Sequence, residues 1–117
     1  MLRDASYDHI YIYAGYADLR KGIDGLKAII RNSFGLNPAD ENSIFLFCGR
    51  RSDRIKALVY EGDGYVLLYK RLSDGRFQWP RSADEVMQLE PRQFRWLMEG
   101  LSVEQKKAIR DTHPHIV

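Results

Sequence analysis

The sequence predicts an α+β fold: a small antiparallel β-meander with one N-terminal helix packed on a face and short C-terminal helices. Three observations indicate this class. The chain has 117 residues, which suits one domain over residues 1–117 with a core of its own. Runs of β-branched and aromatic residues separated by turn residues fill its middle, whereas apolar residues at helical spacing flank them. A single cysteine is present, so no disulfide framework replaces the core.

The first predicted elements are a strand and a helix. Residues 10–14 are β-branched and aromatic and are followed by Gly15, which predicts a strand. Apolar residues then recur at spacings of 4, 3 and 4, as on one face of a helix, at Leu19, Ile23, Leu26 and Ile30. We expect Asp18 to be the N-cap of this helix and Gly35 to end it.

Three strands are predicted next, at residues 44–48, 55–61 and 65–72. Asp63-Gly64 is a strong signal for a two-residue type I′ turn, and such a turn places Lys56 directly opposite Arg71. In that register one face of the hairpin is aromatic and basic, and the other is aliphatic. We expect the aliphatic face to be the core beneath the first helix.

The remaining predicted elements are short. A strand is expected at residues 76–79, after the Asp74-Gly75 turn, and Pro80 would end it. Pro91 suits the first position of a helix whose apolar stripe runs up to Gly100. The pattern Ser-Val-Glu-Gln at residues 102–105 is typical of a capping box and predicts a last short helix through about Arg110.

The composition of the chain argues against a membrane protein and against a secreted one. The longest apolar runs are far shorter than the roughly 20 residues that span a bilayer, so no membrane partner is expected. The polar N-terminus carries no signal-peptide pattern, and we expect a cytoplasmic protein. Cys48 alternates with core positions of a predicted strand, so it should be buried and inert among Ile44, Leu46 and Ile55.

Positive charge is concentrated in the middle of the chain. The net charge is +2, but residues 49–81 hold 8 Lys and Arg against 4 Asp and Glu, whereas each flanking segment holds 5 against 6. Like charges placed directly opposite each other, as predicted for Lys56 and Arg71, destabilise a hairpin unless an anion offsets them. An arginine-rich turn and the strands beside it supply most of these cations: Arg50, Arg51, Arg54, Lys56, Lys70, Arg71 and Arg76.

Aromatic residues are interleaved with these cations, at Phe45, Phe47, Tyr60, Tyr69, Phe77 and Trp79. Cations for phosphate and rings for base stacking are the combination that single-strand binding proteins use. The alternative is that the rings belong to the core under the C-terminal helices and that the arginines only solvate a hairpin tip. The sequence leaves both interpretations open.

No catalytic or metal site is predicted. The histidines, His9, His113 and His115, lack a second ligand pair, and the chain has no Cys-x-x-Cys motif. No motif places a general base beside Cys48. Turn, cap and counter-ion roles account for the carboxylates, which disfavours a two-metal nuclease site. We therefore expect neither enzyme activity nor a metal or other cofactor.

Several motifs together resemble a known family. They are Asp-Leu-Arg-Lys-Gly-Ile-Asp-Gly-Leu at 18–26, Phe-x-Phe-x-x-Arg-Arg-x-Asp-Arg-x-Lys at 45–56, Gly-x-Gly at 62–64, and Leu-Tyr-Lys-Arg-Leu-x-x-Gly-Arg-Phe-x-Trp-Pro at 68–80. Their order and spacing, over about residues 10–101, resemble the TnpB-type accessory protein of the IS66 insertion-sequence family, which is distinct from the RNA-guided nucleases of the same name. The departures are mild: Tyr60-Glu61 stands for a usual Trp-Asp, Gln78 for Arg or Lys, and Tyr16-Ala17 for Pro-Thr.

The resemblance implies an accessory protein that supports DNA transposition beside the transposase. Its polar motif residues suggest a basic hairpin surface that binds element DNA. The expected nucleic-acid-binding residues are Arg20, Lys21, Arg50, Arg51, Arg54, Lys56, Tyr69, Lys70, Arg71, Arg76 and Trp79. The alternative is a protein-protein adaptor for the transposase or another element-encoded protein, without direct nucleic-acid binding.

Overall fold

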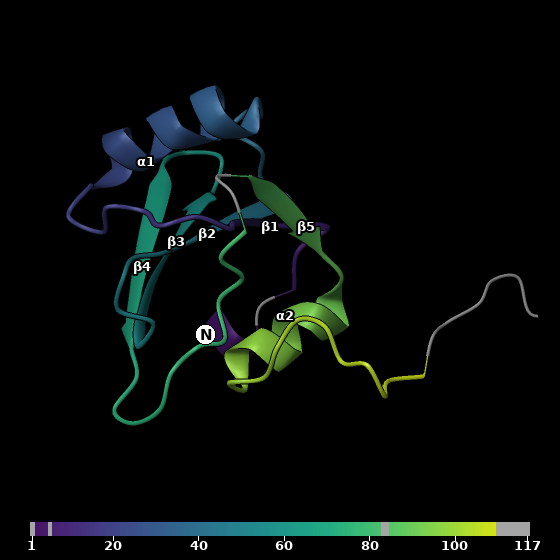
Figure 1. The fold of residues 1–117 in the computed structure, drawn as a ribbon. Coiled ribbons are helices and arrows are strands. Elements are labelled where there is room, and N and C mark those ends of the chain that lie inside the picture. The colour runs from purple at the N-terminus through teal and green to yellow at the C-terminus, as the bar shows by residue number, and fades with distance from the viewer. Residues whose placement is uncertain (1, 5, 83–84, 110–117) are drawn as a thin grey trace, which may run out of the picture.

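A five-stranded sheet with a helix on either face forms the centre of the protein (Figure 1). The computed structural model describes residues 2–4, 6–82 and 85–109. The predicted α+β class, with an N-terminal helix on one face, is confirmed. The strands are β1 (His9–Tyr13), β2 (Ser43–Cys48), β3 (Arg54–Tyr60), β4 (Tyr65–Arg71) and β5 (Val86–Leu89). The helices are α1 (Ile23–Ile29), which continues as a π-helical turn (Ile30–Phe34), and α2 (Pro91–Met98), and a 3-10 turn covers Leu2–Asp4.

The strands lie in the order β4-β3-β2-β1-β5. β2, β3 and β4 form the predicted antiparallel meander, and β5 pairs antiparallel with β1. β1 and β2 run parallel, which requires a crossover connection, and α1 with its π-helical extension lies in that connection. The meander therefore leaves β4 at one edge of the sheet, where α1 reaches across to contact it.

The two faces of the sheet are buried by different helices. Leu26 and Ile30 pack with Phe45 and Phe47 on one face, whereas α2 packs through Leu97 on the aliphatic face. β2 is consequently buried along its whole length. The expectation that the first helix covers the aliphatic face is wrong, because it covers the aromatic one. Alternation assigns residues to faces, but both helices have an apolar stripe, so the pattern does not say which helix covers which face.

The predicted hairpin register is wrong by two residues. Lys56 pairs with Tyr69, and the like charges that lie directly opposite each other are Arg54 and Arg71. The connection is the four residues 61–64, in which the positive φ falls on Gly62, at 91°, and not on Asp63 or Gly64 as a type I′ turn requires. Because side chains alternate with a period of two, this shift keeps every side chain on its predicted face.

The helix ends follow the sequence signals in part. Gly35 ends the first helix with φ 63° as predicted, but the N-cap is Gly22, because Asp18 bonds to Arg20 in a preceding turn. α2 begins at Pro91 as predicted, with a capping box in the residues around it. In the described part of the chain, no helix is long and apolar enough to cross a membrane.

Two predictions for the later part of the chain are wrong. Residues 76–79 form no strand, because the Phe77 N–H donates to the Ser52 carbonyl of the β2–β3 turn and not to a neighbouring strand. The fifth strand, which was not predicted, is β5. Residues 102–109 form no helix, since the Ser102 hydroxyl accepts the backbone N–H of Glu104 in a short local turn instead. Arg110, His113 and His115 lie outside the described residues.

Candidate functional site

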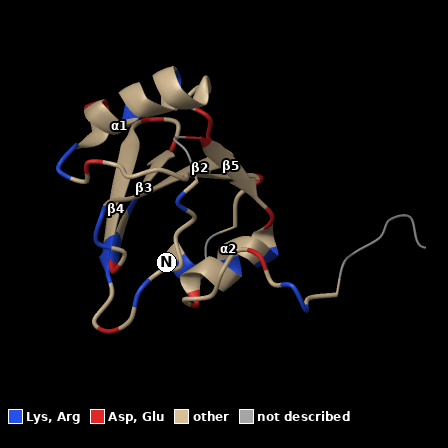
Figure 2. Cartoon of the chain, in the orientation of Figure 1, with Lys and Arg blue, Asp and Glu red and all other residues tan. Residues whose placement is uncertain are grey.

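Many of the predicted cations converge on one hollow of about 860 Å³, which we call the arginine groove. Its walls come from the loop before α1, from the β2–β3 turn and from the face of β3 and β4 that α1 partly covers. Figure 2 shows Lys and Arg on that loop and along the neighbouring ends of β3 and β4. The lining residues are Tyr16–Arg20, Gly49–Arg51, Arg54, Lys56, Leu67 and Tyr69.

The Arg50-Arg51 turn separates this groove from a second hollow of about 610 Å³. Arg76 lines the second hollow together with residues 72–75, which connect β4 to the chain that follows. Arg71 is exposed and lies opposite Arg54 at the end of β4, and it lines neither hollow. The predicted residues therefore form a band of positive charge along the β2–β3 turn and the end of β4.

Three predicted residues are placed differently. Lys21 is exposed beside the groove, where its backbone carbonyl accepts a hydrogen bond from Lys56 Nζ at 3.1 Å. Lys70 pairs with Ile55 and so lies on the opposite face of the sheet. Trp79 is only 6 % exposed in the aliphatic core, and its Nε1–H donates to the Tyr13 carbonyl at 2.8 Å. Its ring is therefore not part of the basic surface.

The groove wall depends on a close approach of two backbone segments. The Ala17 N–H donates to the Cys48 carbonyl at 2.9 Å, which joins the loop after β1 to the end of β2. A Cβ atom on Gly49 would lie 3.2 Å from the Ala17 carbonyl oxygen. Glycine at residue 49 is what lets the two segments lie this close.

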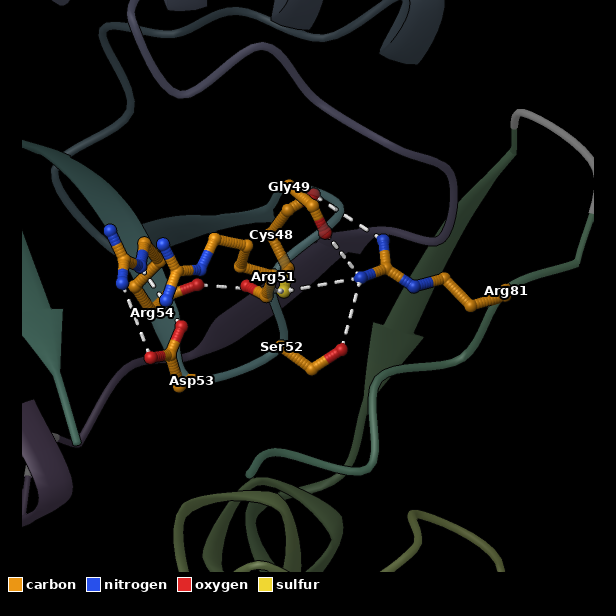
Figure 3. A network of polar contacts seen from close by, with 7 residues as sticks. All are labelled: Cys48, Gly49, Arg51, Ser52, Asp53, Arg54 and Arg81. Carbon is orange, nitrogen blue, oxygen red and sulfur yellow. Dashed lines mark hydrogen bonds and ion pairs between the residues drawn. The ribbon is translucent and has the colours of Figure 1, made fainter. Parts of the chain in front are cut away.

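Arg81 fastens these segments, although its position in the sequence gave no indication of it. Its guanidinium donates to the Gly15 carbonyl at 3.0 Å. It also donates to the Gly49 carbonyl and, at 3.4 Å, to Ser52 Oγ (Figure 3). The same guanidinium lies 4.1 Å from the ring centroid of Tyr16. From the sequence, Arg81 was counted only in the charge balance. No pattern of nearby residues indicates that the chain returns to the end of β2 at residue 81.

The cations of the groove differ in whether a carboxylate neutralises them. Arg20 pairs with Asp18 through two hydrogen bonds of 3.0 Å, and Arg54 pairs with Asp53 at 2.9 and 3.2 Å (Figure 3). The hydrogen bonds from Arg20 lower the pKa of Asp18 to about 2, and those from Arg54 lower the pKa of Asp53. Within the described residues, Arg50, Arg51 and Lys56 form no ion pair.

Two tyrosine rings stand open beside these cations. Tyr16 is 57 % exposed and has the Arg50 guanidinium 5.7 Å from its centroid, in addition to Arg81. Tyr69 is 54 % exposed and has Lys56 Nζ at 6.0 Å. Tyr16 was not among the predicted site residues, and the only signal for it was that it departs from the family pattern.

Cys48 lies behind the groove and is fully buried, as predicted. It pairs with Ile55 across β2 and β3, and Arg81 donates to its Sγ at 3.5 Å. Burial raises the pKa of the Cys48 thiol, although the nearby Arg81 cation acts in the opposite direction. Over residues 2–4, 6–82 and 85–109, no three His, Cys, Asp or Glu side chains gather as a metal site would require.

Comparison of the sequence with known proteins identifies a matching family. A family model described as "IS66 Orf2 like protein" matches residues 8–108. Two similar relatives come from Sinorhizobium fredii (strain NBRC 101917 / NGR234). "Uncharacterized protein y4hO" is 33% identical over 101 residues, covering 86% of this chain and 87% of the relative. "Uncharacterized protein y4jC" is 32% identical over 84 residues, covering 72% and 71%. No solved structure matches the chain.

Proposed function

Because the chain belongs to the IS66 Orf2 like family and is an accessory protein of an insertion sequence, we propose that it supports transposition by holding nucleic acid in the arginine groove. The nucleic acid proposed is that of the element itself. The proposed role is one of binding alone. The transposase is then the protein to which the bound nucleic acid would be presented.

The observation that carries the proposal is the set of unneutralised cations on one hollow. Arg50, Arg51 and Lys56 line the groove without an ion pair to any carboxylate of the described residues. Cations gathered in this way repel one another, and a bound polyanion relieves the repulsion. Phosphate groups of nucleic acid release counterions when such cations neutralise them, which supplies affinity independent of sequence.

The decisive experiment measures binding at several salt concentrations. Fluorescence anisotropy of labelled oligonucleotides, single-stranded and duplex, should show binding by the purified protein that weakens as salt rises. If four phosphates are neutralised on a duplex, log affinity should fall against log salt with a slope of about −3.6. The variant Arg50→Ala/Arg51→Ala should reduce the magnitude of that slope by about 1.8.

A matched control keeps the loss of charge constant. Arg31 and Arg95 are exposed on the two helical segments, away from the groove lining, so Arg31→Ala/Arg95→Ala removes the same charge elsewhere. This control should keep most of the wild-type affinity. Absence of binding by the wild type at low salt, or equal loss in both double variants, would refute the groove as a nucleic-acid site. If the wild-type protein does not bind nucleic acid but still captures the transposase after nuclease treatment, it is instead an adaptor. Its arginines would then face carboxylates of the partner protein.

A further inference from the structure

We propose that the ligand of the arginine groove is single-stranded, and that two of its bases stack on Tyr16 and Tyr69. This inference rests on the proposed function and adds the class of nucleic acid and the residues that select it. It starts from two exposed aromatic rings on the lining of one hollow, each accompanied by a cation.

Tyr16 is held in place and yet open. It follows the turn at Gly15, whose carbonyl accepts a hydrogen bond from Arg81, and the Arg81 guanidinium lies 4.1 Å from the ring centroid. More than half of the side chain nevertheless remains exposed. A ring that is already ordered loses little conformational entropy when a base stacks on it.

Tyr69 is held by the sheet. It lies on β4 directly opposite Lys56, with Lys56 Nζ 6.0 Å from its ring centroid. Its neighbour on the same face of β4 is Leu67, which also lines the groove, so an apolar surface continues from the ring into the hollow. Large exposed aromatic residues inside a hollow, beside cations, are characteristic of sites where bases stack.

The exposed rings distinguish a single strand from a duplex. A duplex presents phosphates, sugars and base edges, while its base faces are covered by stacking within the helix. Rings on the groove wall could therefore contact base faces only in an unpaired strand.

The test compares oligonucleotides that differ only in their bases. A fluorescein-labelled dT strand of about ten nucleotides is matched by a strand with the same number of phosphates and abasic sites at its central positions. The wild-type protein should bind the intact strand about 5- to 150-fold more tightly for each base that stacks. Tyr16→Ala/Tyr69→Ala should bind both strands with the same, lower affinity, and Tyr16→Phe/Tyr69→Phe should behave as the wild type.

The outcomes separate this inference from the proposed function. Equal binding of intact and abasic strands by the wild type, with the expected salt dependence, would overturn the stacking inference and leave nucleic-acid binding intact. Tighter binding to a duplex with the same number of phosphates would also overturn it. Failure of the wild type to bind any of these probes at low salt would overturn the proposed function itself. Circular dichroism of the two tyrosine variants should match that of the wild type, because both side chains are largely exposed.

Discussion

Arg81 holds the wall of the arginine groove together although it does not line the groove itself. Its guanidinium donates to the Gly15 carbonyl on the loop after β1, and to the Gly49 carbonyl and Ser52 Oγ on the β2–β3 turn, so these two segments meet at one side chain. A guanidinium is suited to this because its N–H groups point in several fixed directions. The exposed Arg50 has no comparable set of partners in the described structure, and the two arginines should therefore respond differently to substitution.

Replacing Arg81 should cost stability, whereas replacing Arg50 should cost binding. Arg81→Ala leaves partly buried carbonyls without a donor and should lower the free energy of unfolding by about 1 to 3 kcal/mol. Arg81→Lys should recover only part of this loss, because an ammonium cannot reproduce the fork. Arg50→Ala should change the free energy of unfolding by about 0.5 kcal/mol or less. Urea unfolding of the three variants measures these differences, and equal destabilisation by Arg50→Ala and Arg81→Ala would contradict the assignment.

The Asp18 carboxylate should titrate at low pH. Hydrogen bonds from Arg20 hold its pKa at about 2, below the ordinary value, because they favour the ionised form. The stabilising effect of this pair is therefore present above about pH 4 and is lost as pH falls through about 2. Carboxyl NMR titration should show this value for Asp18 in the wild type and a higher pKa in Arg20→Ala, and an unchanged pKa in that variant would contradict the role of Arg20.

The same pair predicts which arginines matter for binding. Arg20 is already neutralised by Asp18, whereas Arg50 has no carboxylate partner in the described structure. Arg20→Ala should therefore reduce oligonucleotide affinity less than Arg50→Ala does, in the same anisotropy assay at the same salt concentration. A larger loss in Arg20→Ala would mean that the ligand displaces Asp18 from the ion pair.

At the scale of elements, the β3–β4 connection adopts a conformation that differs from the one its sequence motif predicts. Gly62 has φ 91°, and a Cβ atom there would also lie 3.3 Å from the Glu41 carboxyl group. Gly64 has no positive φ, and nothing lies within 4 Å of a Cβ atom built on it. The Asp63-Gly64 pair predicted a positive φ at Gly64. In the four-residue connection the positive φ is at Gly62 instead.

Gly62→Ala and Gly64→Ala form a matched pair that tests this connection. Gly62→Ala should lower the free energy of unfolding by about 1 to 2 kcal/mol, because an L side chain is strained at positive φ. Gly64→Ala should be neutral or slightly stabilising, since it restricts the unfolded chain without strain in the fold. Thermal unfolding followed by circular dichroism measures both. The opposite order of melting temperatures would support the two-residue turn that the sequence predicted.

At the scale of the whole molecule, β2 joins two cores. Its side chains are buried on both faces, under the first helix on one face and under α2 on the other. Loss of packing on either face therefore weakens the same strand and its ladders to β1 and β3. We expect the two cores to unfold together in one cooperative transition.

Truncation on either face tests this cooperativity. Leu26 and Leu97 are both fully buried, one in each core, and each Leu→Ala change should cost about 2 to 5 kcal/mol. Far-UV circular dichroism reports on all elements, whereas the fluorescence of Trp79 and Trp96 reports on the α2 side of the sheet. In Leu26→Ala the two signals should still change at the same urea concentration. Two separate transitions would show that the cores are independent.

The sequence by itself determined the local features. The runs at residues 10–14 and 44–48 became β1 and β2 with small shifts at their ends, Gly35 and Pro91 bound their helices, and Cys48 is buried. Most of the groove cations could also be predicted as a group, because the turn and the hairpin that carry them are close in sequence. Strand alternation, caps and turns act over a few residues, so a pattern of a few residues reveals them.

Tertiary structure decided what depends on distant segments. Four features bring together residues that are far apart in the chain. They are the helix that covers each face, the pairing of β5 with β1, the burial of Trp79, and the position of Arg81 across the groove wall. The choice of Tyr16 as a groove residue depends on the same contact. Such arrangements are fixed by the packing of whole faces and by hydrogen bonds to backbone carbonyls, and neither leaves a periodic signal in the sequence.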